Sequence, residues 1–206
     1  YAIDLTKYAC EVGADAMLLV TPYYNKATQK GLVASFKAVA DASTKPCILY
    51  NVPSRTGCNL LPETVLELAD HPNIVAIKEA SGNIGQMDEI IKNKPEGFDV
   101  ISGDDGITFP LITLGAVGVI SVLGNAFPAE FSKMNRLALE GNYAEALTIH
   151  HQFTEIINLL FADGNPAGAK AMLNIMGMCE NKLRLPLVPA REVTYEKLRA
   201  AWEALK

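Results

Sequence analysis

The chain has 206 residues, of which 50% are hydrophobic and 20% are charged, a composition that suits a globular protein with a sizeable core. Its net charge is only -5 and it has no cluster of Lys and Arg, which argues against a nucleic-acid-binding protein. No apolar run reaches the roughly 18 to 20 residues that a membrane span needs, so we expect no membrane partner either.

The cysteines indicate the cellular compartment, and the first residue indicates whether the sequence is part of a longer chain. Cys10, Cys47, Cys58 and Cys179 form no CxxC pair, which favours reduced thiols in a cytoplasmic protein. The sequence begins at Tyr1, without a methionine, inside a helix-like segment and without a secretory signal pattern. We therefore expect it to be the remainder of a longer chain.

Short apolar runs alternate with helix-like segments in the first part of the chain. The apolar runs at 16–22, 47–53, 74–80, 98–104 and 118–124 predict strands, with helices between them. The strand ends are predicted at Thr21, Asn51, Glu79, Gly103 and Val122. Nearly continuous hydrophobic strands separated by helices are typical of a parallel sheet covered on both faces, so the predicted class is α/β. Pro62 suits the first turn of one helix, and Asn83 and Asp104 are candidate N-caps.

The pattern changes after Gly124. Four helices are predicted with no strand between them, over 128–141, 142–163, 165–180 and 193–206. We therefore predict a strand–helix part that carries the catalytic site, residues 1–141, and a C-terminal helical domain, residues 142–206.

Polar side chains gather where the predicted strands end. They are Thr21, Tyr23 and Tyr24 after the first strand, Tyr50, Asn51 and Arg55 after the second, Lys78 and Glu79 after the third, Gly103, Asp104 and Asp105 after the fourth, and Ser121 after the fifth. Ligands bind at this edge in parallel α/β sheets and in barrels. The sequence therefore places a site at the carboxyl ends of the strands.

Lys78 is the most informative of these residues because it ends an apolar run, where an ammonium is costly unless it is paired or neutral. Alternation along the strand puts Ala76, Lys78 and Ala80 on one face and Glu79 on the other. Small neighbours leave space around the amine, and a desolvated lysine is a nucleophile for a carbonyl group. The alternative is an ordinary solvated lysine beside Glu79 at a strand end.

Two other patterns have simpler interpretations. SGDDG, residues 102–106, lacks the lysine and the spacing of a phosphate-binding P-loop and fits a capped helix start better. His150 and His151 are adjacent on a predicted helix, so their side chains diverge by about 100°, and His71 is distant in sequence. We therefore expect no metal site and no zinc-dependent chemistry.

Five motifs occur in order along the chain: TPYYN, LYNVPSRTG, IKEASGN, SGDD and GVISV. Together they closely resemble the 4-hydroxy-tetrahydrodipicolinate synthase (dihydrodipicolinate synthase) family of pyruvate-dependent Schiff-base lyases and aldolases. The resemblance runs from Tyr1 to Lys206 and implies a (β/α)8 TIM barrel followed by a C-terminal helical extension. The family's first three strands and its Gly-Thr-Thr loop are absent, so we expect an incomplete barrel, with strands four to eight over residues 1–141.

The resemblance assigns catalytic roles to three residues. Lys78 matches the lysine that forms a Schiff base with pyruvate. Tyr50 matches the tyrosine that relays protons to and from the imine and the aldehyde substrate. Tyr24 matches a tyrosine that a neighbouring subunit inserts into the site to extend this relay.

It also implies the substrate-binding residues and the reaction. Arg55 would hold carboxylates at the entrance, and the backbones of Gly103 and Ile120 would line the pyruvate pocket. The implied enzyme is a cytoplasmic carbon–oxygen lyase that condenses pyruvate with L-aspartate 4-semialdehyde in the diaminopimelate route to lysine. It would need no cofactor beyond the imine and would form a homotetramer, a dimer of dimers.

Two alternatives stay open. One is a sibling such as N-acetylneuraminate lyase or a 2-keto-3-deoxy-sugar aldolase, although those generally lack the arginine of PSRTG. The other is a non-catalytic fragment that has kept the site residues.

Overall fold

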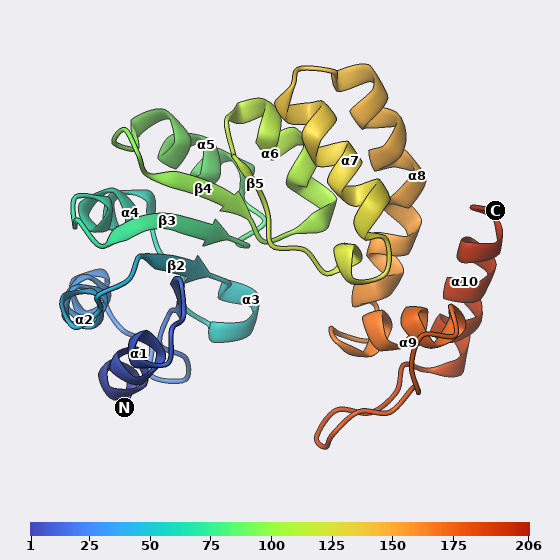
Figure 1. Cartoon of the computed structure of the whole chain (residues 1–206), viewed down its shortest axis with the longest axis horizontal. Helices are drawn as coiled ribbons and strands as arrows, with labels where there is room; N and C mark the ends of the chain where they lie inside the picture. Colours follow the sequence, from blue (N-terminus) through green and yellow to red (C-terminus); the bar gives the residue numbers. More distant parts are fainter. The chain divides into compact units, whose positions relative to one another are not determined.

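The structure is a computed structural model that describes residues 1–206 and divides into two compact units. The first unit comprises Tyr1–Asp104 and Leu114–Ile120, and the second comprises Asp105–Thr113 and Ser121–Lys206. All the strands lie in the first unit, and the second is helical (Figure 1). These units are defined by contacts within each of them and not by function. The predicted division into a catalytic part, 1–141, and a helical domain, 142–206, therefore stays a prediction.

The first unit is built on one parallel sheet in which the strands follow chain order. They are β1 Met17–Val20, β2 Cys47–Asn51, β3 Ile74–Glu79, β4 Asp99–Ser102 and β5 Gly118–Val119. Each strand pairs in parallel with the next, so β1 and β5 are the two edges. The predicted five parallel strands are confirmed, and no strand forms in residues 125–206.

The fifth strand is shorter than the sequence suggests. Ile120 makes the last ladder hydrogen bond, donating to the carbonyl of Ser102 at 2.9 Å. The chain then turns into the 3-10 helix η2, Leu123–Asn125, because the buried carboxylate of Asp105 accepts hydrogen bonds from the amides of Val122 (3.0 Å) and Leu123 (2.7 Å). The prediction of a strand as far as Val122 is therefore wrong.

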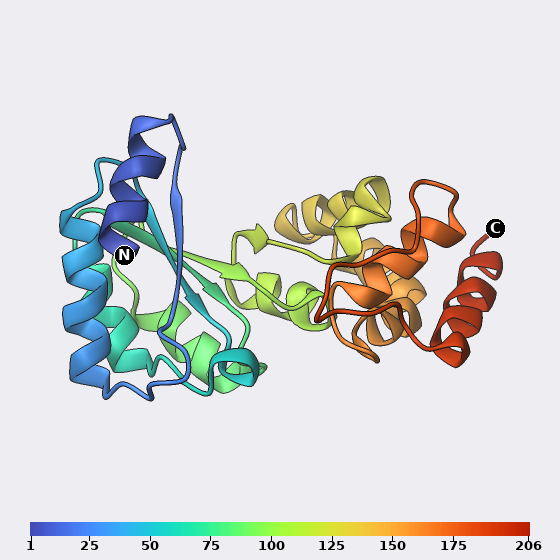
Figure 2. The same ribbon diagram turned by 90° about the horizontal axis from the view of Figure 1, so that it is seen from below.

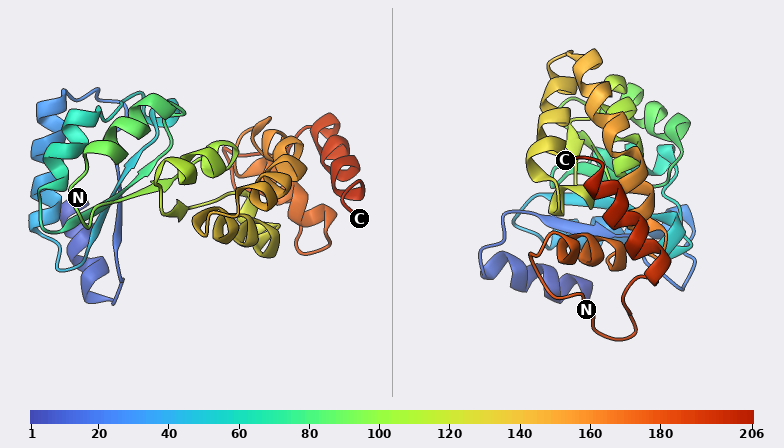
Figure 3. Two further views of the ribbon diagram at one scale, coloured as in Figure 1. Left: turned by 90° about the horizontal axis from the view of Figure 1, so that it is seen from above. Right: turned by 90° about the vertical axis from the view of Figure 1, so that its right-hand side faces the viewer.

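Helices cover one face of this sheet. The helices of the first unit are α1 Ala2–Glu11, α2 Gln29–Asp41, α3 Pro53–Thr56, α4 Pro62–Ala69 and α5 Ile84–Asn93. Helices α2, α4 and α5 lie side by side on one side of the strands (Figures 1 and 3), and their apolar residues form a core with residues of the strands. That core includes Leu32, Phe36, Leu68 and Ile90 from the helices and Leu49, Ile77 and Val100 from the strands.

The opposite face of the sheet is less covered than expected. Leu18 and Val20 of β1 are 47% and 41% exposed, so burial by helices holds for one face only.

The predicted helix starts are confirmed at two points. Pro62 occupies the first turn of α4, and the Asn83 side chain caps α5 by accepting from the amide of Gln86 at 3.1 Å.

The second unit contains the short 3-10 helix η1 Asp105–Ile107, most of α6 Thr108–Leu114, and four longer helices. These are α7 Pro128–Leu139, α8 Tyr143–Phe161, α9 Ala167–Ile175 and α10 Glu192–Glu203. Helices α7 and α8 pack on each other, and α9 and α10 pack on α8 (Figure 2). The four helices predicted after Gly124 are thus confirmed, and no helix has the length and hydrophobicity that a membrane crossing requires.

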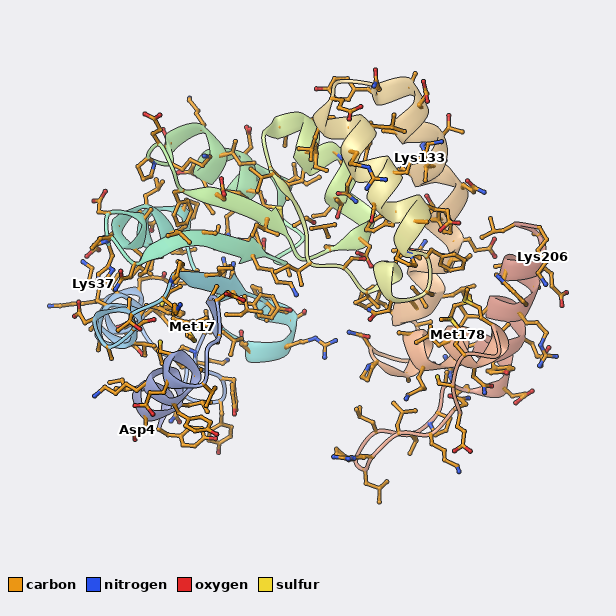
Figure 4. All side chains as sticks on the ribbon, in the orientation of Figure 1. Asp4, Met17, Lys37, Lys133, Met178 and Lys206 are labelled. Carbon is orange, nitrogen blue, oxygen red and sulfur yellow. The ribbon has the colours of Figure 1, made fainter.

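Helix α9 is shorter than predicted. It ends at Ile175 rather than continuing to residue 180, because Gly177 adopts a left-handed conformation with φ +75°. The following connection to α10 carries Met178, which is 65% exposed (labelled in Figure 4).

Gly168 lets α9 approach the backbone of α8 closely. A Cβ atom at this position would lie 2.6 Å from the carbonyl carbon and from the Cα of Leu160, and closer still to its carbonyl oxygen. We expect Gly168→Ala to lower the free energy of unfolding of the second unit by roughly 1–3 kcal/mol, as overpacking against a rigid backbone does. Urea unfolding followed by far-UV circular dichroism measures the change.

Gly31 of α2 supplies the matched control. It is helical, its φ is not in the left-handed region, and an added Cβ would meet only side chains at 3.4 Å or beyond. Gly31→Ala should stabilise the first unit by about 0.5–1 kcal/mol. Equal effects of the two substitutions would contradict the packing assigned to Gly168.

Candidate active site

Lys78 and Tyr50 lie together at the carboxyl ends of β3 and β2. They are direct partners in the parallel ladder, both are half-buried, and the Lys78 Nζ lies 4.3 Å from the centroid of the Tyr50 ring. An ammonium over an aromatic face is attracted by the negative face of the ring. Lys37 shows the contrast, because it is an ordinary lysine on α2, 40% exposed and paired with Glu67 at 3.0 Å (labelled in Figure 4).

A β-bulge makes this pairing possible. Cys47 pairs with Ile74, but Ile48 pairs with Ala76, so β3 contains one extra residue at the start of the ladder. Beyond the bulge, Tyr50 pairs with Lys78 and Asn51 with Glu79. Without the extra residue, Lys78 would face Asn51 instead of Tyr50.

Gly103 leaves room for the lysine side chain. It follows β4, and its amide donates to the carbonyl of Glu79 at 2.7 Å. A Cβ atom at this position would lie 3.0 Å from the Lys78 Cε and 2.8 Å from the Ala80 Cβ. Ile120, which follows β5 at the same edge, is 40% exposed.

Arg55 influences the phenol of Tyr50. The sequence places Arg55 after the second strand and does not assign it to a helix. The structure puts it in the last turn of the four-residue helix α3, which Pro53 begins and Gly57 ends with φ +67°. Burial raises the pKa of the Tyr50 phenol above its usual 10.0, and the positive charge of Arg55 acts in the opposite direction. A raised pKa keeps this phenol protonated at neutral pH, so it can donate a proton.

Tyr24 stands apart from this group. It is 92% exposed, and its neighbour Tyr23 is 71% exposed. Tyr24 also has φ +69°, a conformation that is uncommon for residues other than glycine. Its side chain is therefore not packed within the first unit, and its predicted role in a neighbouring site stays a prediction.

Glu79 is not the surface partner of Lys78 that the alternative interpretation requires. Its side chain is 0% exposed and lies on the face of β3 that the helices cover. It accepts hydrogen bonds from the amide of Ser81 (2.6 Å) and from the side chains of Asn51 (3.0 Å) and Gln86 (3.2 Å). Alternation in the sequence indicates this face, but nothing in the sequence identifies these partners.

The SGDDG segment is a helix start, as expected. Asp105 is 1% exposed and begins η1, which leads into α6. Its carboxylate accepts hydrogen bonds from the backbone amides of Val122 and Leu123. The chain has no group of three or more His, Cys, Asp or Glu placed to hold a metal ion.

This geometry agrees with the comparison to known proteins. A sequence model of the dihydrodipicolinate synthetase family matches residues 1–205. The chain belongs to this family. Curated relatives named 4-hydroxy-tetrahydrodipicolinate synthase include that of Phocaeicola vulgatus, 69% identical over 195 residues, and that of Parabacteroides distasonis, 68% identical over 188 residues. These alignments cover 94% and 91% of this chain but 66% and 63% of the relatives, so the chain spans just under two thirds of their length.

Solved structures of the dihydrodipicolinate synthetase family share the fold. Dihydrodipicolinate synthase from Aquifex aeolicus superposes with a TM-score of 0.95 at 43% identity, covering 98% of this chain and 70% of that one. The chloride-inhibited enzyme from Acinetobacter baumannii, solved in complex with pyruvate, gives a TM-score of 0.94 at 43% identity and covers 98% and 69%. At this identity the likeness supports the α/β class, with a parallel sheet and helices.

The link between Arg55 and Tyr50 can be tested by titration. We expect Arg55→Ala to raise the pKa of Tyr50 further, because it removes the positive charge that opposes the effect of burial. Ultraviolet titration of the phenols, taken as a difference against Tyr50→Phe, isolates this residue. Arg184→Ala changes the net charge equally in the second unit and should leave the Tyr50 curve in place; an equal shift there would contradict a local effect.

Proposed function

We propose that this chain carries the imine-forming site of a 4-hydroxy-tetrahydrodipicolinate synthase, with Lys78 as the nucleophile. The observation that carries the proposal is the position of the Lys78 amine, 4.3 Å from the Tyr50 ring centroid at the carboxyl edge of the sheet. The substrates would be pyruvate and L-aspartate 4-semialdehyde, in the diaminopimelate route to lysine. Membership in the family and relatives of that name support this choice.

The first half of the reaction uses the pair of residues on β2 and β3. The neutral amine of Lys78 attacks the ketone carbon of pyruvate, and a water molecule leaves as the imine forms. The protonated imine withdraws electrons, so a proton leaves the methyl group and an enamine results. Tyr50, whose ring lies beside the amine, would give a proton to the departing oxygen and take one back. No cofactor is needed, because the imine itself accepts the electrons.

The second half joins the two substrates. The enamine carbon attacks the aldehyde carbon of the semialdehyde and forms the new carbon–carbon bond. The amino group of the semialdehyde then attacks the imine carbon, which closes the ring and releases the Lys78 amine. Arg55, exposed in α3, would hold a carboxylate of the semialdehyde, since a guanidinium binds a planar carboxylate with two parallel hydrogen bonds.

Gly103 and Ile120 would shape the pyruvate pocket. The steric argument is strongest for Gly103, where any side chain would press on the Lys78 Cε. Ile120 would contribute its backbone at the same edge of the sheet, where its amide already pairs with Ser102.

The proposal includes a wider assembly. The strands β1 to β5 would be the fourth to eighth of a (β/α)8 barrel; the two edges and the exposed Leu18 and Val20 support this assignment. Tyr24, almost fully exposed in a left-handed conformation, would reach the site of a neighbouring subunit in a homotetramer. The free thiols of the four cysteines support a reducing, cytoplasmic setting.

Trapping with borohydride tests the nucleophile. Incubation of the chain with pyruvate and borohydride should add one reduced pyruvate to the peptide that contains Lys78, as measured by mass spectrometry. Lys78→Ala removes the amine, and Lys78→Arg replaces it with a guanidinium that stays protonated, so both should lose the adduct. Lys37→Ala is the matched control and should keep it. An adduct on a different lysine, or one that survives in Lys78→Arg, would overturn the assignment.

Arg55→Ala separates the two substrates. Because Arg55 lies beyond the strand end in α3, its loss should lower consumption of the semialdehyde by roughly tenfold to a hundredfold, the effect of one charged hydrogen-bond donor. Pyruvate trapping at Lys78 should stay within about twofold. Equal loss of both activities would contradict a role for Arg55 with the aldehyde. Efficient cleavage of N-acetylneuraminate or of a 2-keto-3-deoxy sugar would favour the sibling lyases.

A further inference from the structure

A fully buried carboxyl group follows the proposed nucleophile directly in the chain. Glu79 is 0% exposed and points to the opposite face of β3 from Lys78. The donors that reach its two oxygens come from three neutral residues, namely Ser81, through its amide and its hydroxyl, and the side chains of Asn51 and Gln86. Buried glutamates without a cationic partner are uncommon, because desolvation of a carboxylate is costly. Burial accordingly raises the pKa of Glu79, and its hydrogen bonds oppose the rise.

The hydrogen bonds continue from Glu79 into a closed cluster, which we call the Glu79 cluster and define as Asn51, Asn59, Glu79 and Gln86. The Asn51 Nδ2 donates to the Asn59 Oδ1 at 2.8 Å, and the Asn59 Nδ2 donates to the Gln86 Oε1 at 2.9 Å. The Gln86 Nε2 closes the circuit at the Glu79 Oε2 (3.2 Å). The cluster also holds the backbone of Leu60, whose amide binds Asn51 and whose carbonyl binds Gln86, both at 3.0 Å.

Three of these four side chains come from segments that carry the proposed site, and the fourth comes from helix α5. Asn51 ends β2 directly after Tyr50, and Glu79 ends β3 directly after Lys78. Asn59 lies just beyond α3, which carries Arg55, and Gln86 lies in the first turn of α5. The cluster therefore connects the ends of β2 and β3 and the segment after α3. It lies on the opposite face of the sheet from Lys78 and Tyr50.

The ladder shows how the support acts. Asn51 and Glu79 are register partners, immediately after the pair formed by Tyr50 and Lys78. A side-chain hydrogen bond between the last pair prevents the two strand ends from fraying or slipping. Slippage by one residue would turn Lys78 to the other face of the sheet. The hydrogen bond from the Ala80 amide to the Asn51 carbonyl, 2.9 Å, extends the same alignment by one step.

We propose that Glu79 is a positioning residue, which holds the ends of β2 and β3 in the alignment that keeps the Lys78 amine against the Tyr50 ring. The inference rests on the proposed function for its catalytic meaning. A carboxylate suits this position better than a carboxamide, because its two oxygens can accept from all three donor residues. A carboxamide has a single acceptor oxygen, and its NH₂ group would face the NH₂ group of Asn51 or of Gln86.

Glu79→Gln is the central variant, since it keeps the size and removes the second acceptor. We expect the rate of pyruvate-dependent borohydride trapping at Lys78 to fall at least about tenfold, as misplacement of a reacting group by a fraction of an ångström does. The double variant Asn51→Asp with Glu79→Gln restores one carboxylate and one carboxamide across the same register pair. It should recover part of the lost rate, but not all of it, because an aspartate at position 51 no longer donates to the Asn59 Oδ1.

Thr64→Val controls for a general loss of stability. The Thr64 hydroxyl donates to the Gln29 Oε1 at 2.6 Å, a part-buried hydrogen bond between α4 and α2, and it makes no hydrogen bond to a member of the Glu79 cluster. The Gln29 Nε2 donates to the backbone carbonyl of Asn59 at 2.8 Å, a contact that Thr64→Val leaves in place. Its loss should lower the midpoint of thermal unfolding while trapping stays within about twofold. If Thr64→Val and Glu79→Gln slow trapping equally, or if trapping only follows the unfolding midpoint, the positioning role is overturned.

A measurement that needs no reaction separates this inference from the proposed function. The Tyr50 ring should shift the resonances of the Lys78 side chain in spectra of lysine-labelled protein, with Lys78→Arg identifying the signal. Glu79→Gln should move this signal toward that of a solvated lysine, and Thr64→Val should leave it in place. Failure of the unmodified chain to trap pyruvate, together with this pattern of shifts, would refute the enzyme assignment and support the positioning role. An unchanged Lys78 signal in Glu79→Gln would overturn the positioning role, whatever the chain does with pyruvate.

Discussion

The alignment of β2 with β3 is the constraint on which the candidate site depends. A β-bulge sets this alignment, because β3 has one extra residue between the partners of Cys47 and Ile48. The bulge therefore determines which residue of β2 each later residue of β3 pairs with. Residues on the two faces then differ in their exposure to solvent. Lys78 points to the half-exposed face, and Ile77 and Glu79 point to the helices. A slip of one residue would bury the ammonium among aliphatic side chains, at a cost that makes the observed alignment strongly preferred.

The two faces of the carboxyl edge divide the polar residues by task. Tyr50 and Lys78 form one row, directed away from the helices and available to a ligand. Asn51, Glu79 and Ser102 form the other row; all three are 0% exposed, and all three make hydrogen bonds that shape the strand ends. A polar residue at this edge therefore does not have to meet the substrate to matter for the chemistry. Such a residue lies on the opposite face of the same strands from Tyr50 and Lys78, next to them along the chain.

Much of this arrangement could be predicted from the sequence, and the failures have physical causes. Apolar runs and helical stripes located the strands and most helices, and the alternation around Lys78 placed the amine on the correct face, because these signals are local. Helix α3 was missed, since four residues are too few to show a stripe and only Pro53 and Gly57 mark it. The bulge has no local signal, and the Glu79 cluster joins residues that lie 7 to 28 positions from Glu79. Such contacts depend on the tertiary fold, which short-range patterns do not contain.

The residues of the proposed site differ in how locally their surroundings are built. The Lys78–Tyr50 pair and the cluster that supports it lie within residues 50–86, on two adjacent central strands and the helix that follows them. Their geometry therefore does not depend on what pairs with the edge strands β1 and β5. Tyr24 and Ile120, in contrast, lie next to those edges and are largely or partly exposed, so their surroundings are set by whatever packs there. Under the proposed function, imine formation at Lys78 and the contact of Arg55 with the semialdehyde would both use this central region, whereas a proton relay through Tyr24 would depend on the environment of the edges. If the proposed function holds, the residues for imine chemistry are encoded in the centre of this sheet, and the residues whose surroundings remain to be completed by other parts of an assembly lie at its edges.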